Sequence, residues 1–495
     1  EIETEESSVD ETGIPPELFD FQREGVQFLI KHPRALLGDE MGLGKTVQTI
    51  VASLLTADEG DRILIVCPNS LKWTWAKEFE RWAPTTSVQL VTGDRPTREK
   101  QILSDARVTI INYELFRYGL KTDRGKREWS HDTQLVMKRK WRTIVLDEAH
   151  RVKNRDAQVT RALTAITKTI DRVYLLTGTP ILNRLEELWS LLRILFPKEY
   201  TSYWRFVERY CQVFSNGFGT EVGPARPEML PELKTILDGF TLRRLKRNVL
   251  PSLPRKLPIR RVWVPLEKSQ RDVYQGMAEE MYTILESGEV VSAAVAVAQI
   301  TRLKQIVIDP NLMAQPDLPL RGTKVDAVLD ILESMAGEKV VIFSQFATAL
   351  NRLQKTLSAK GYDTSIITGE VTGEDRQAVV DRFQTDPSNQ VLLCGLKSGG
   401  VGITLTAAHT AIFLDKFWNP ALNWQAQERL DRIGQTEPVT IIELLAEKTI
   451  EESIEKLLVQ KADLFSSLFE TADAPVARTS LTTILGMLKE FQKSF

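Results

Sequence analysis

The sequence contains very little cysteine. Its three cysteines, Cys67, Cys211 and Cys394, lie far apart in a chain of 495 residues and form no C-x-x-C pair. Such scarcity fits a reducing compartment and argues against a structural zinc site. The sequence also lacks a secretory signal and any apolar run near the ~18 residues of a membrane span. We therefore expect an intracellular protein with no membrane partner, located in the nucleus if eukaryotic and in the cytoplasm or nucleoid if prokaryotic or viral.

An excess of charge of either sign is also missing. The 64 Lys and Arg residues nearly balance the 66 Asp and Glu residues, so the net charge of −2 gives no argument for nucleic-acid binding. Local patches exist, because residues 240–266 hold eight basic residues and no acid, and residues 121–142 are also basic. At the other end, residues 1–14 form an acidic tail that we expect to be disordered. The chain begins at Glu1 and not at methionine, which favours a trimmed chain.

The sequence does contain short apolar, β-branched runs that alternate with helical patterns. Runs of this kind, bounded by turn residues, are typical of parallel strands buried on both faces. They occupy residues 62–68, 107–114, 142–148, 172–178, 339–344, 390–395, 410–415 and 438–444. The runs fall into two groups, separated by a mostly helical stretch at 181–320. The sequence therefore predicts an α/β fold with two parallel-sheet lobes and a helical, basic insert between them.

The expected domain boundaries follow from this grouping. We place a first lobe with a helical protrusion at 15–250, and a helical, basic insert and linker at 251–320. A second lobe follows at 321–465, and a helical segment at 466–495 ends the chain.

The loop GDEMGLGKT, residues 38–46, follows a strand-like segment and precedes a helical pattern. It matches the phosphate-loop pattern G-x-x-x-x-G-K-[ST], except that Asp39 occupies the slot of the first glycine. That slot only starts the turn, and aspartate tolerates turn geometry. At a helix N-terminus, the backbone N–H groups of this loop can cradle phosphate oxygens; they belong to Met41, Gly42, Leu43, Gly44 and Lys45. Lys45 would place its ammonium on the β- and γ-phosphates, and the Thr46 hydroxyl would reach Mg²⁺.

Two further motifs complete a site for ATP hydrolysis. VLDEAH, residues 145–150, ends a buried strand in two carboxylates. Asp147 can hold Mg²⁺ through water, and Glu148 can orient and deprotonate the attacking water. Arg429 and Arg432, in NWQAQERLDRIGQ, are three residues apart and are expected on one helix face. Arginines of a separate lobe can act on the transferred γ-phosphoryl group, so we expect ATP and Mg²⁺ as ligands and Lys45 among the catalytic residues.

These motifs, in this order, resemble the motor of superfamily two helicase-like ATPases and, within it, the Swi/Snf (Snf-two) family of DNA translocases. The resemblance covers residues 15–465 and rests on GDEMGLGKT, LDEAH, LTGTP (176–180) and QAQERLDRIGQ (425–435). It implies two RecA-like lobes with ATP bound between them. It also implies that Gln22 of LFDFQREGVQFL reads adenine, that Asp39 is the family's residue at that slot, and that Gly402 of GLKSGGVGITLTAA (395–408) lies where the second lobe closes on ATP.

The resemblance implies that duplex DNA is the partner, gripped by both lobes through its phosphate backbone with little sequence specificity. The implied contacts are Asn69, Lys72, Thr177, Gly178, Ser344, Gln345, Lys397, Ser398 and Gly399. CPNSLKWTWAKEF (67–79), with Trp75 and Glu78, resembles the DNA-contact motif of the first lobe. The expected load is a DNA-bound protein such as a nucleosome or a polymerase, moved by a monomeric motor.

Three departures from the family pattern concern the second lobe. Thr404 stands where many members have Asn, Glu428 replaces an Asp, and Asp431 replaces a His. Both arginines of the last motif are present, so the departures bear on coupling and not on hydrolysis itself. The wording GVGITLTAA is nearer to the branch-remodelling, fork-acting members than to nucleosome remodellers.

Two alternatives to a duplex-DNA translocase stay open. The DEAH wording also resembles strand-separating helicases that act on DNA or RNA. The second alternative is a protein that is not an enzyme, a scaffold that binds ATP and nucleic acid without hydrolysing ATP. The intact Lys45, Asp147 and Glu148 disfavour this alternative. No chromodomain, bromodomain or zinc module is recognisable, so the chain is expected to be a bare motor.

Overall fold

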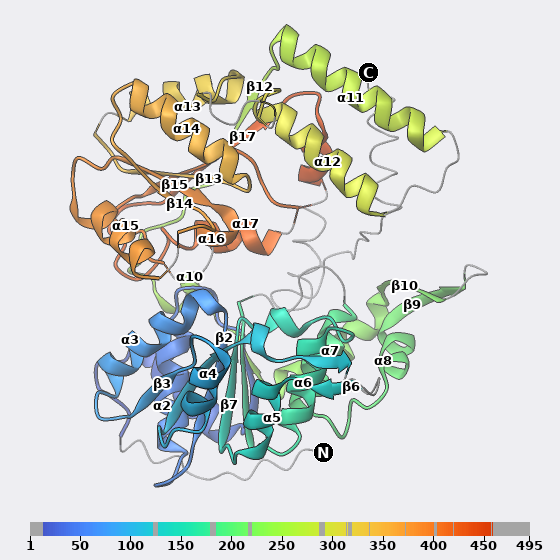
Figure 1. Cartoon of the computed structure of the whole chain (residues 1–495), viewed down its shortest axis with the longest axis vertical. Helices are drawn as coiled ribbons and strands as arrows, with labels where there is room; N and C mark the ends of the chain where they lie inside the picture. The colour runs from blue at the N-terminus through green and yellow to red at the C-terminus, as the bar shows by residue number, and fades with distance from the viewer. Residues whose placement is uncertain are drawn as a thin grey trace. The chain divides into compact units, whose positions relative to one another are not determined.

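The computed structural model of the chain describes residues 13–121, 127–178, 185–215, 220–286, 293–312, 314, 319–335, 337–371, 373–399, 403–418, 420–456 and 458 (Figure 1). The chain divides into two compact units. The first contains residues 1–251 with 463–476, and the second contains residues 252–462 with 477–495. Most of the expected acidic tail and all of the expected C-terminal helical segment lie outside the described residues.

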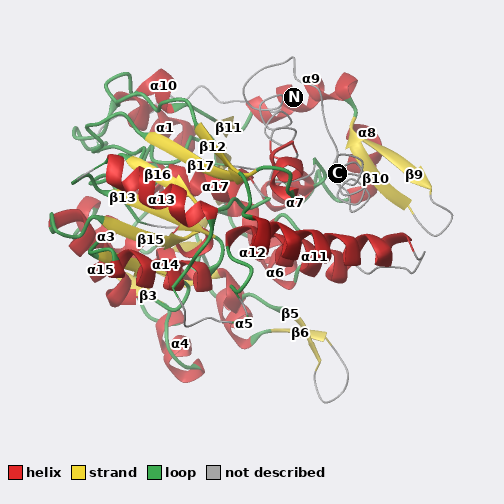
Figure 2. Ribbon diagram, turned by 90° about the horizontal axis from the view of Figure 1, so that it is seen from above, coloured by secondary structure: helices red, strands yellow, loops and turns green. Residues whose placement is uncertain are grey.

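The first unit is built around a seven-stranded parallel sheet. In spatial order its strands are β11 (Thr241–Leu242), β1 (Arg34–Leu37), β8 (Arg172–Leu176), β7 (Thr143–Asp147), β2 (Ile63–Cys67), β4 (Val108–Asn112) and β3 (Val88–Leu90). Two antiparallel hairpins project from the unit, as Figure 2 shows: β5 (Tyr118–Lys121) with β6 (Arg127–Trp129), and β9 (Cys211–Ser215) with β10 (Thr220–Ala225).

The helices of the first unit connect these strands. They are α1 (Asp20–Lys31), α2 (Lys45–Leu55), α3 (Lys72–Trp82), α4 (Arg95–Ile102), α5 (His131–Lys138), α6 (Gln158–Thr167), α7 (Glu187–Leu195), α8 (Tyr203–Tyr210), α9 (Leu230–Asp238) and α10 (Lys246–Val249). All five residues of β2 are buried, because both faces of the sheet are covered. Full burial explains why this strand is a continuous apolar run in the sequence.

The second unit contains a six-stranded parallel sheet. Its strands, in spatial order, are β12 (Arg260–Val264), β17 (Thr440–Ala446), β16 (Thr410–Phe413), β13 (Val340–Ser344), β15 (Val391–Gly395) and β14 (Thr364–Ile367). Its helices are α11 (Lys268–Glu286), α12 (Ala293–Ile308), α13 (Thr323–Ser334), α14 (Ala347–Ala359), α15 (Gly373–Thr385), α16 (Leu396–Gly399) and α17 (Pro420–Gln427).

The central strand β13 shows how this second sheet is buried. Val340 and Ile342 enter one apolar core with α13 and α14, while Val341 and Phe343 enter another core with α15 and α17. Figure 1 shows these helix pairs on opposite faces of the sheet. Successive side chains of a strand point to opposite faces, so both cores draw on one strand. The predicted fold class, two parallel-sheet lobes of an α/β protein, is confirmed.

The region expected to be mostly helical, 181–320, also contains strands. Residues 260–264, expected within the helical and basic insert, form the edge strand β12 beside β17. The strand begins with Arg260 and Arg261, both exposed, and reaches a buried residue only at Val264, so it lacks the apolar run of a central strand. The helices α11 and α12 lie side by side and pack through Tyr274 and Leu303 against the end of β17.

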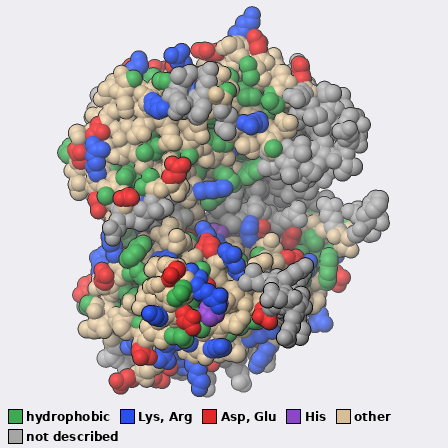
Figure 3. All heavy atoms as spheres, viewed as in Figure 1, with side chains coloured by type: hydrophobic (Ala, Val, Ile, Leu, Met, Phe, Trp, Pro, Cys, Tyr) green, Lys and Arg blue, Asp and Glu red, His purple; other side chains and the backbone are tan. Residues whose placement is uncertain are grey.

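The surface carries charges of both signs. On the face of each unit drawn in Figure 3, Lys and Arg side chains are interspersed with Asp and Glu. Among the helices of the described residues, none combines the length and the apolar character needed to cross a membrane.

Candidate active site

Three loops of the first unit meet because the strands before them are neighbours. β1 pairs with β8, and β8 pairs with β7, all in parallel. The carboxyl ends of such strands lie at one edge of the sheet, where α/β proteins bind ligands. This edge brings together the phosphate loop after β1, Thr177 and Gly178 after β8, and Asp147 and Glu148 at the end of β7.

The phosphate loop has the backbone of an anion cradle. Gly42 and Gly44 adopt φ values of 88° and 74°, in the left-handed region that glycine enters without strain. Helix α2 begins at Lys45, so the N–H groups of its first turn, Thr46 included, have no partner within the helix. A Cβ on Gly44 would lie 2.5 Å from the side-chain nitrogen of Gln22, so a larger residue would have to displace the Gln22 side chain.

Lys45 stands at the centre of this charged site. Its Nζ donates to the backbone oxygens of Asp39 and Glu40, at 2.7 and 3.3 Å. Burial lowers the pKa of Lys45, and the negative charges of Glu148, Asp39 and Asp147 oppose that shift. The Lys45 ammonium therefore interacts electrostatically with both carboxylates at the end of β7, Asp147 and Glu148. The two predicted motifs thus form one charged site.

Gln22, predicted to read adenine, fastens α1 to the phosphate loop. Its Nε2 donates to the carbonyl of the buried Leu43 at 3.2 Å, and its Oε1 accepts from the backbone N–H of Phe19 at 3.2 Å. The side chain of Met41, in the same loop, lies close to Gly178, where an added Cβ would be 2.9 Å from the Met41 Cγ.

Asp39 does not turn its carboxylate toward the loop cavity. The side chain has no exposed surface, and Arg244 holds it with Nε at 3.0 Å from Oδ1 and Nη2 at 2.5 Å from Oδ2. The backbone N–H of Arg244 and the amide of Gln48 also donate to it. Asp39 therefore acts in the structure as an anchor beneath the loop, and a direct contact between its carboxylate and a nucleotide is not supported.

Arg243 and Lys246, next to Arg244 in the chain, also bind this loop. Arg243 Nη1 donates to the carbonyls of Gly38 and Gly178, at 2.9 and 3.2 Å, and so ties the loop after β1 to the loop after β8. Lys246 is buried, and its backbone N–H donates to Glu40 at 2.7 Å. In the sequence these three residues stand out only as members of a basic patch, and no local pattern indicates their contacts with the loop. Lys256 and Arg261 bind acceptors in the second unit, so five of the eight basic residues of that patch make hydrogen bonds to the protein, Lys246 through its backbone N–H.

Asp147 is held from three sides at the end of β7. Trp75 Nε1 donates to its Oδ2 at 2.8 Å, the N–H of Glu148 donates to its Oδ1 at 2.9 Å, and the Tyr113 hydroxyl donates to its backbone oxygen at 2.7 Å. Burial and the neighbouring Glu148 raise the pKa of Asp147, while the Trp75 hydrogen bond and Lys45 oppose the shift. Trp75 is itself buried, so this residue of the predicted DNA-contact motif orients the carboxylate.

Glu148 has an unusual backbone conformation. Its φ of 52° and ψ of 50° place a non-glycine residue in the left-handed region, a form of strain found at functional sites. Its Oε2 lies 3.3 Å from the Nδ1 of His150, and that nitrogen also lies 3.3 Å from the hydroxyl of Thr177. Burial and the charges of Arg151 and Lys153 lower the pKa of His150 to about 3, so the ring is neutral near pH 7. The His150 ring therefore lies between the Glu148 carboxylate and the loop after β8.

The predicted DNA contacts of the first unit differ in their access to solvent. Asn69 is exposed at the start of a short 3₁₀ helix, whereas Thr177 is fully buried. Lys72 is also buried, and its ammonium donates to Val91 O at 2.8 Å and to Asn112 Oδ1 at 3.3 Å. A lysine bound in this way supports the fold, which speaks against a direct phosphate contact. Thr179 and Pro180, the last residues of LTGTP, lie outside the described residues.

In the second unit, the ends of β13 and β16 are joined by polar side chains. The buried Ser344 hydroxyl and the Gln345 amide donate to Asp415, the amide at 2.7 Å. These two hydrogen bonds turn both side chains toward the protein. For the buried Ser344, this speaks against a direct contact with DNA. Lys397 is exposed on α16, with its Nζ 5.1 Å from the centre of the Phe417 ring. Gly402 and the side chain of Ser398 lie outside the described residues, and Gly399 ends α16.

Arg429 and Arg432 do not share a helix face as the sequence analysis predicted. Helix α17 ends at Gln427, and both arginines lie in the turns that follow it. Their guanidinium groups nevertheless converge, because each donates to the carbonyl of Ile403, at 3.3 and 3.5 Å. Arg432 also donates to the hydroxyl of Thr404 at 3.0 Å. The departure at Thr404 thus supplies an acceptor for one of these arginines.

Comparison with known proteins places this site in a family. The model of the SNF2-related domain matches residues 21–312, and the model of the helicase conserved C-terminal domain matches residues 323–434. Chromodomain-helicase-DNA-binding protein 1-like of Danio rerio is 33% identical over 475 residues, which cover 91% of this chain and 44% of that protein. DNA annealing helicase and endonuclease ZRANB3 of Homo sapiens is 30% identical over 469 residues, 91% of this chain and 40% of that protein.

A solved structure, the Sulfolobus solfataricus SWI2/SNF2 ATPase core in complex with dsDNA, is 27% identical, with 93% and 94% of the two chains covered and a TM-score of 0.43. The chain spans less than half the length of the two relatives above. The SNF2-related match alone covers more than half of this chain. The chain therefore belongs to the SNF2-related family of helicase-like ATPases.

Proposed function

We propose that this protein couples ATP hydrolysis to movement along duplex DNA. The observation that carries the proposal is the convergence of Lys45, Asp147 and Glu148 at the ends of neighbouring parallel strands, in a chain of the SNF2-related family. The names of its relatives, a chromodomain-helicase-DNA-binding protein and a DNA annealing helicase, support DNA as the partner. A DNA-bound protein such as a nucleosome or a polymerase is the load that we propose for the motor.

Hydrolysis requires a water molecule to attack the γ-phosphorus of ATP in line with the leaving oxygen. Glu148 would take the proton of this water, while Lys45 would offset the negative charge of the phosphates. His150, neutral and placed between Glu148 and Thr177, would confine the carboxylate to this side of the site by its bulk. We propose that Arg429 and Arg432 stabilise charge on the transferred group when the two units close on ATP.

The residues present fit a bound magnesium ion. Thr46, on the first turn of α2, and Asp147, oriented by Trp75, offer the oxygen ligands that Mg²⁺ prefers. When bound, the ion would neutralise charge on the phosphate oxygens. Replacing Asp147 by Asn would remove the negative charge of one expected Mg²⁺ ligand, and the amide oxygen can still accept the hydrogen bond from Trp75.

The test of the proposed function is the steady-state ATPase rate with a set of nucleic acids. We expect strong stimulation by duplex DNA, weaker stimulation by single-stranded DNA or duplex RNA, and loss of activity when EDTA removes Mg²⁺. Displacement of a third strand from a DNA triplex, without separation of the duplex, would show translocation. Separation of a simple fork would favour the strand-separating helicase, and a response to RNA alone would contradict the proposal. Absence of turnover with every nucleic acid would favour the silent scaffold.

A smaller effect is expected from Thr404→Val, which keeps the shape of the side chain and removes the hydroxyl bound by Arg432. One lost hydrogen bond to a charged group corresponds to a decrease of about 10-fold in kcat, because Arg432 loses the acceptor that orients it. Thr406→Val is the matched control, since the Thr406 hydroxyl accepts only a long 3.4 Å bond from Gln384 in this region. Equal kcat values for the two variants would show that Thr404 does not orient Arg432 for catalysis.

A further inference from the structure

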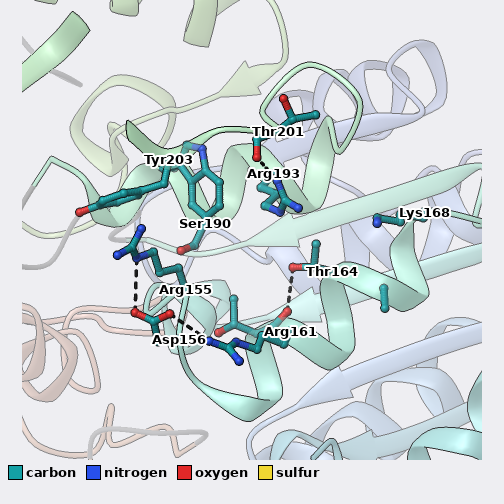
Figure 4. A pocket seen from close by; sticks show the side chains of 12 residues that line it. Arg155, Asp156, Arg161, Thr164, Lys168, Ser190, Arg193, Thr201 and Tyr203 are labelled. Atoms are coloured by element: carbon teal, nitrogen blue, oxygen red, sulfur yellow. Dashed lines mark hydrogen bonds and ion pairs between the residues drawn. The ribbon is translucent and has the colours of Figure 1, made fainter. Parts of the chain in front are cut away.

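We propose that a basic cavity of the first unit binds single-stranded nucleic acid, at a site separate from the phosphate loop. The cavity has a volume of about 380 Å³ and lies between α6, α7 and the segment that leads into α8 (Figure 4). Its lining comes from residues 155–203, and none of the predicted ATP or DNA contacts is among them. The site would add a second nucleic-acid contact to the motor without taking part in hydrolysis.

The charge of the lining favours a polyanion. Arg155, Arg161, Lys168 and Arg193 line the cavity, and Asp156 is the single acid among the lining residues. Asp156 binds two of the arginines, with Arg155 Nε at 3.3 Å and Arg161 Nη2 at 3.1 Å. Four cations against one carboxylate leave a surplus of three positive charges around the cavity. Figure 4 shows Arg155, Arg161 and Arg193 around the hollow, with Lys168 at its side.

Aromatic rings beside these cations favour a nucleic acid over an acidic peptide. The Arg155 guanidinium carbon lies 3.6 Å from the centre of the Tyr203 ring, in a stacked contact, and 5.9 Å from that of Trp204. Trp204 is 41% exposed, which is unusual for so large an apolar side chain. Trp204 follows the lining residue Tyr203, and an exposed ring beside arginines can stack on an unpaired base, because every base offers such a face. A carboxylate peptide would use the cations but not the rings.

A buried donor of the lining also lacks an acceptor within the part of the chain that the structure describes. Trp189 lines the cavity and is only 7% exposed, and its indole N–H finds no acceptor among the described residues. Indole N–H is a donor only, so an oxygen that enters the cavity is the kind of group that can satisfy it. Arg193, whose guanidinium lies 5.1 Å from the Trp189 ring, is held at the same wall by the carbonyls of Tyr200 and Thr201. The wall is therefore fixed before any ligand arrives.

The test is fluorescence anisotropy of labelled oligo-dT of about 12 nucleotides, within the site sizes of single-strand binding modules. The full chain is used with saturating unlabelled duplex DNA, which occupies the proposed translocation contacts. The test variant is R161E with K168E, two exposed residues of α6 and its C-terminal end. The matched control is K31E with K100E, exposed residues of α1 and α4 that do not line the cavity and change the charge equally. W189F removes the N–H and keeps a ring.

We expect the dissociation constant for oligo-dT to rise about 10-fold in R161E with K168E, and to stay unchanged in the control pair. W189F should raise it about 3-fold. The duplex-stimulated ATPase rate should stay unchanged in R161E with K168E, so a failure of the proposed ATPase function appears separately in that assay. An equal loss in both charge-reversal pairs, or no loss in the cavity pair, would overturn the proposal. Displacement of oligo-dT by poly-glutamate of the same charge, as well as by unlabelled oligo-dT, would instead identify an acidic-peptide site.

Discussion

Replacing Glu148 by glutamine is expected to lower the duplex-stimulated ATPase rate by about 10³-fold while ATP still binds. Glutamine has the length and shape of glutamate, but its amide does not take a proton from water. The backbone demand is the same for both residues, so the left-handed φ of 52° at this position is retained. The loss should therefore appear in kcat, measured by phosphate release, and not in the ATP dissociation constant, measured by calorimetry.

Glu114→Gln is the matched control for this experiment. Glu114 is an exposed carboxylate near the same end of the sheet, and it pairs with Arg151 at 3.1 Å. An exposed pair of this kind contributes little, so the control should hydrolyse ATP at the wild-type rate. If Glu148→Gln also keeps most of the wild-type rate, another group must activate the water, and the assignment of Glu148 as the base is wrong.

Replacing Arg244 by methionine is expected to lower the free energy of unfolding by about 3–5 kcal/mol, because it leaves the buried Asp39 carboxylate without its counterion. Asp39 has no exposed surface, and Arg244 supplies both of its short side-chain contacts. The loop that binds phosphate rests on this pair, so the affinity for ATP should fall together with stability. Urea unfolding followed by circular dichroism measures the first effect, and calorimetry with ATP measures the second.

Arg247→Met is the matched control, because it removes an exposed arginine three residues after Arg244. It should change the free energy of unfolding by less than about 0.5 kcal/mol. Asp39→Asn combined with Arg244→Met removes both charges and should recover part of the loss, since no ion then lacks a partner. An Arg244→Met protein as stable as the Arg247→Met protein would show that the pair does not support the loop.

The central part of the fold is predictable from sequence for a physical reason. Strands buried on both faces must be apolar along their whole length, and each of the eight predicted runs overlaps a strand of the two sheets. Edge strands carry no such signature. β3 is only partly buried and β12 begins with exposed arginines, so neither has a continuous apolar run. β3 and β12 form strands because they pair with β4 and β17, and these partner strands come later in the sequence.

The candidate site was predictable only in its short motifs. The loop around Lys45 and the pair at Asp147 are local patterns whose residue types carry the chemistry. The partners that hold them are not local. Arg244 lies 205 residues from Asp39, and Trp75 lies 72 residues from Asp147. The expected DNA contacts of Lys72 and Ser344 are not supported, because both side chains are buried. Their hydrogen-bonding groups bind Val91 and Asp415 of the protein instead.

The pairing of β1 with β11 has a consequence for biosynthesis. The ribosome makes the phosphate loop near the start of the chain, but the segment that fastens it, with Arg243 and Arg244, emerges about two hundred residues later. Contacts so distant in sequence form late, after the intervening chain has closed. A nascent chain that ends before residue 240 would expose GDEMGLGKT without its anchor. The ability to bind nucleotide should therefore arise only when synthesis of the first unit is nearly complete.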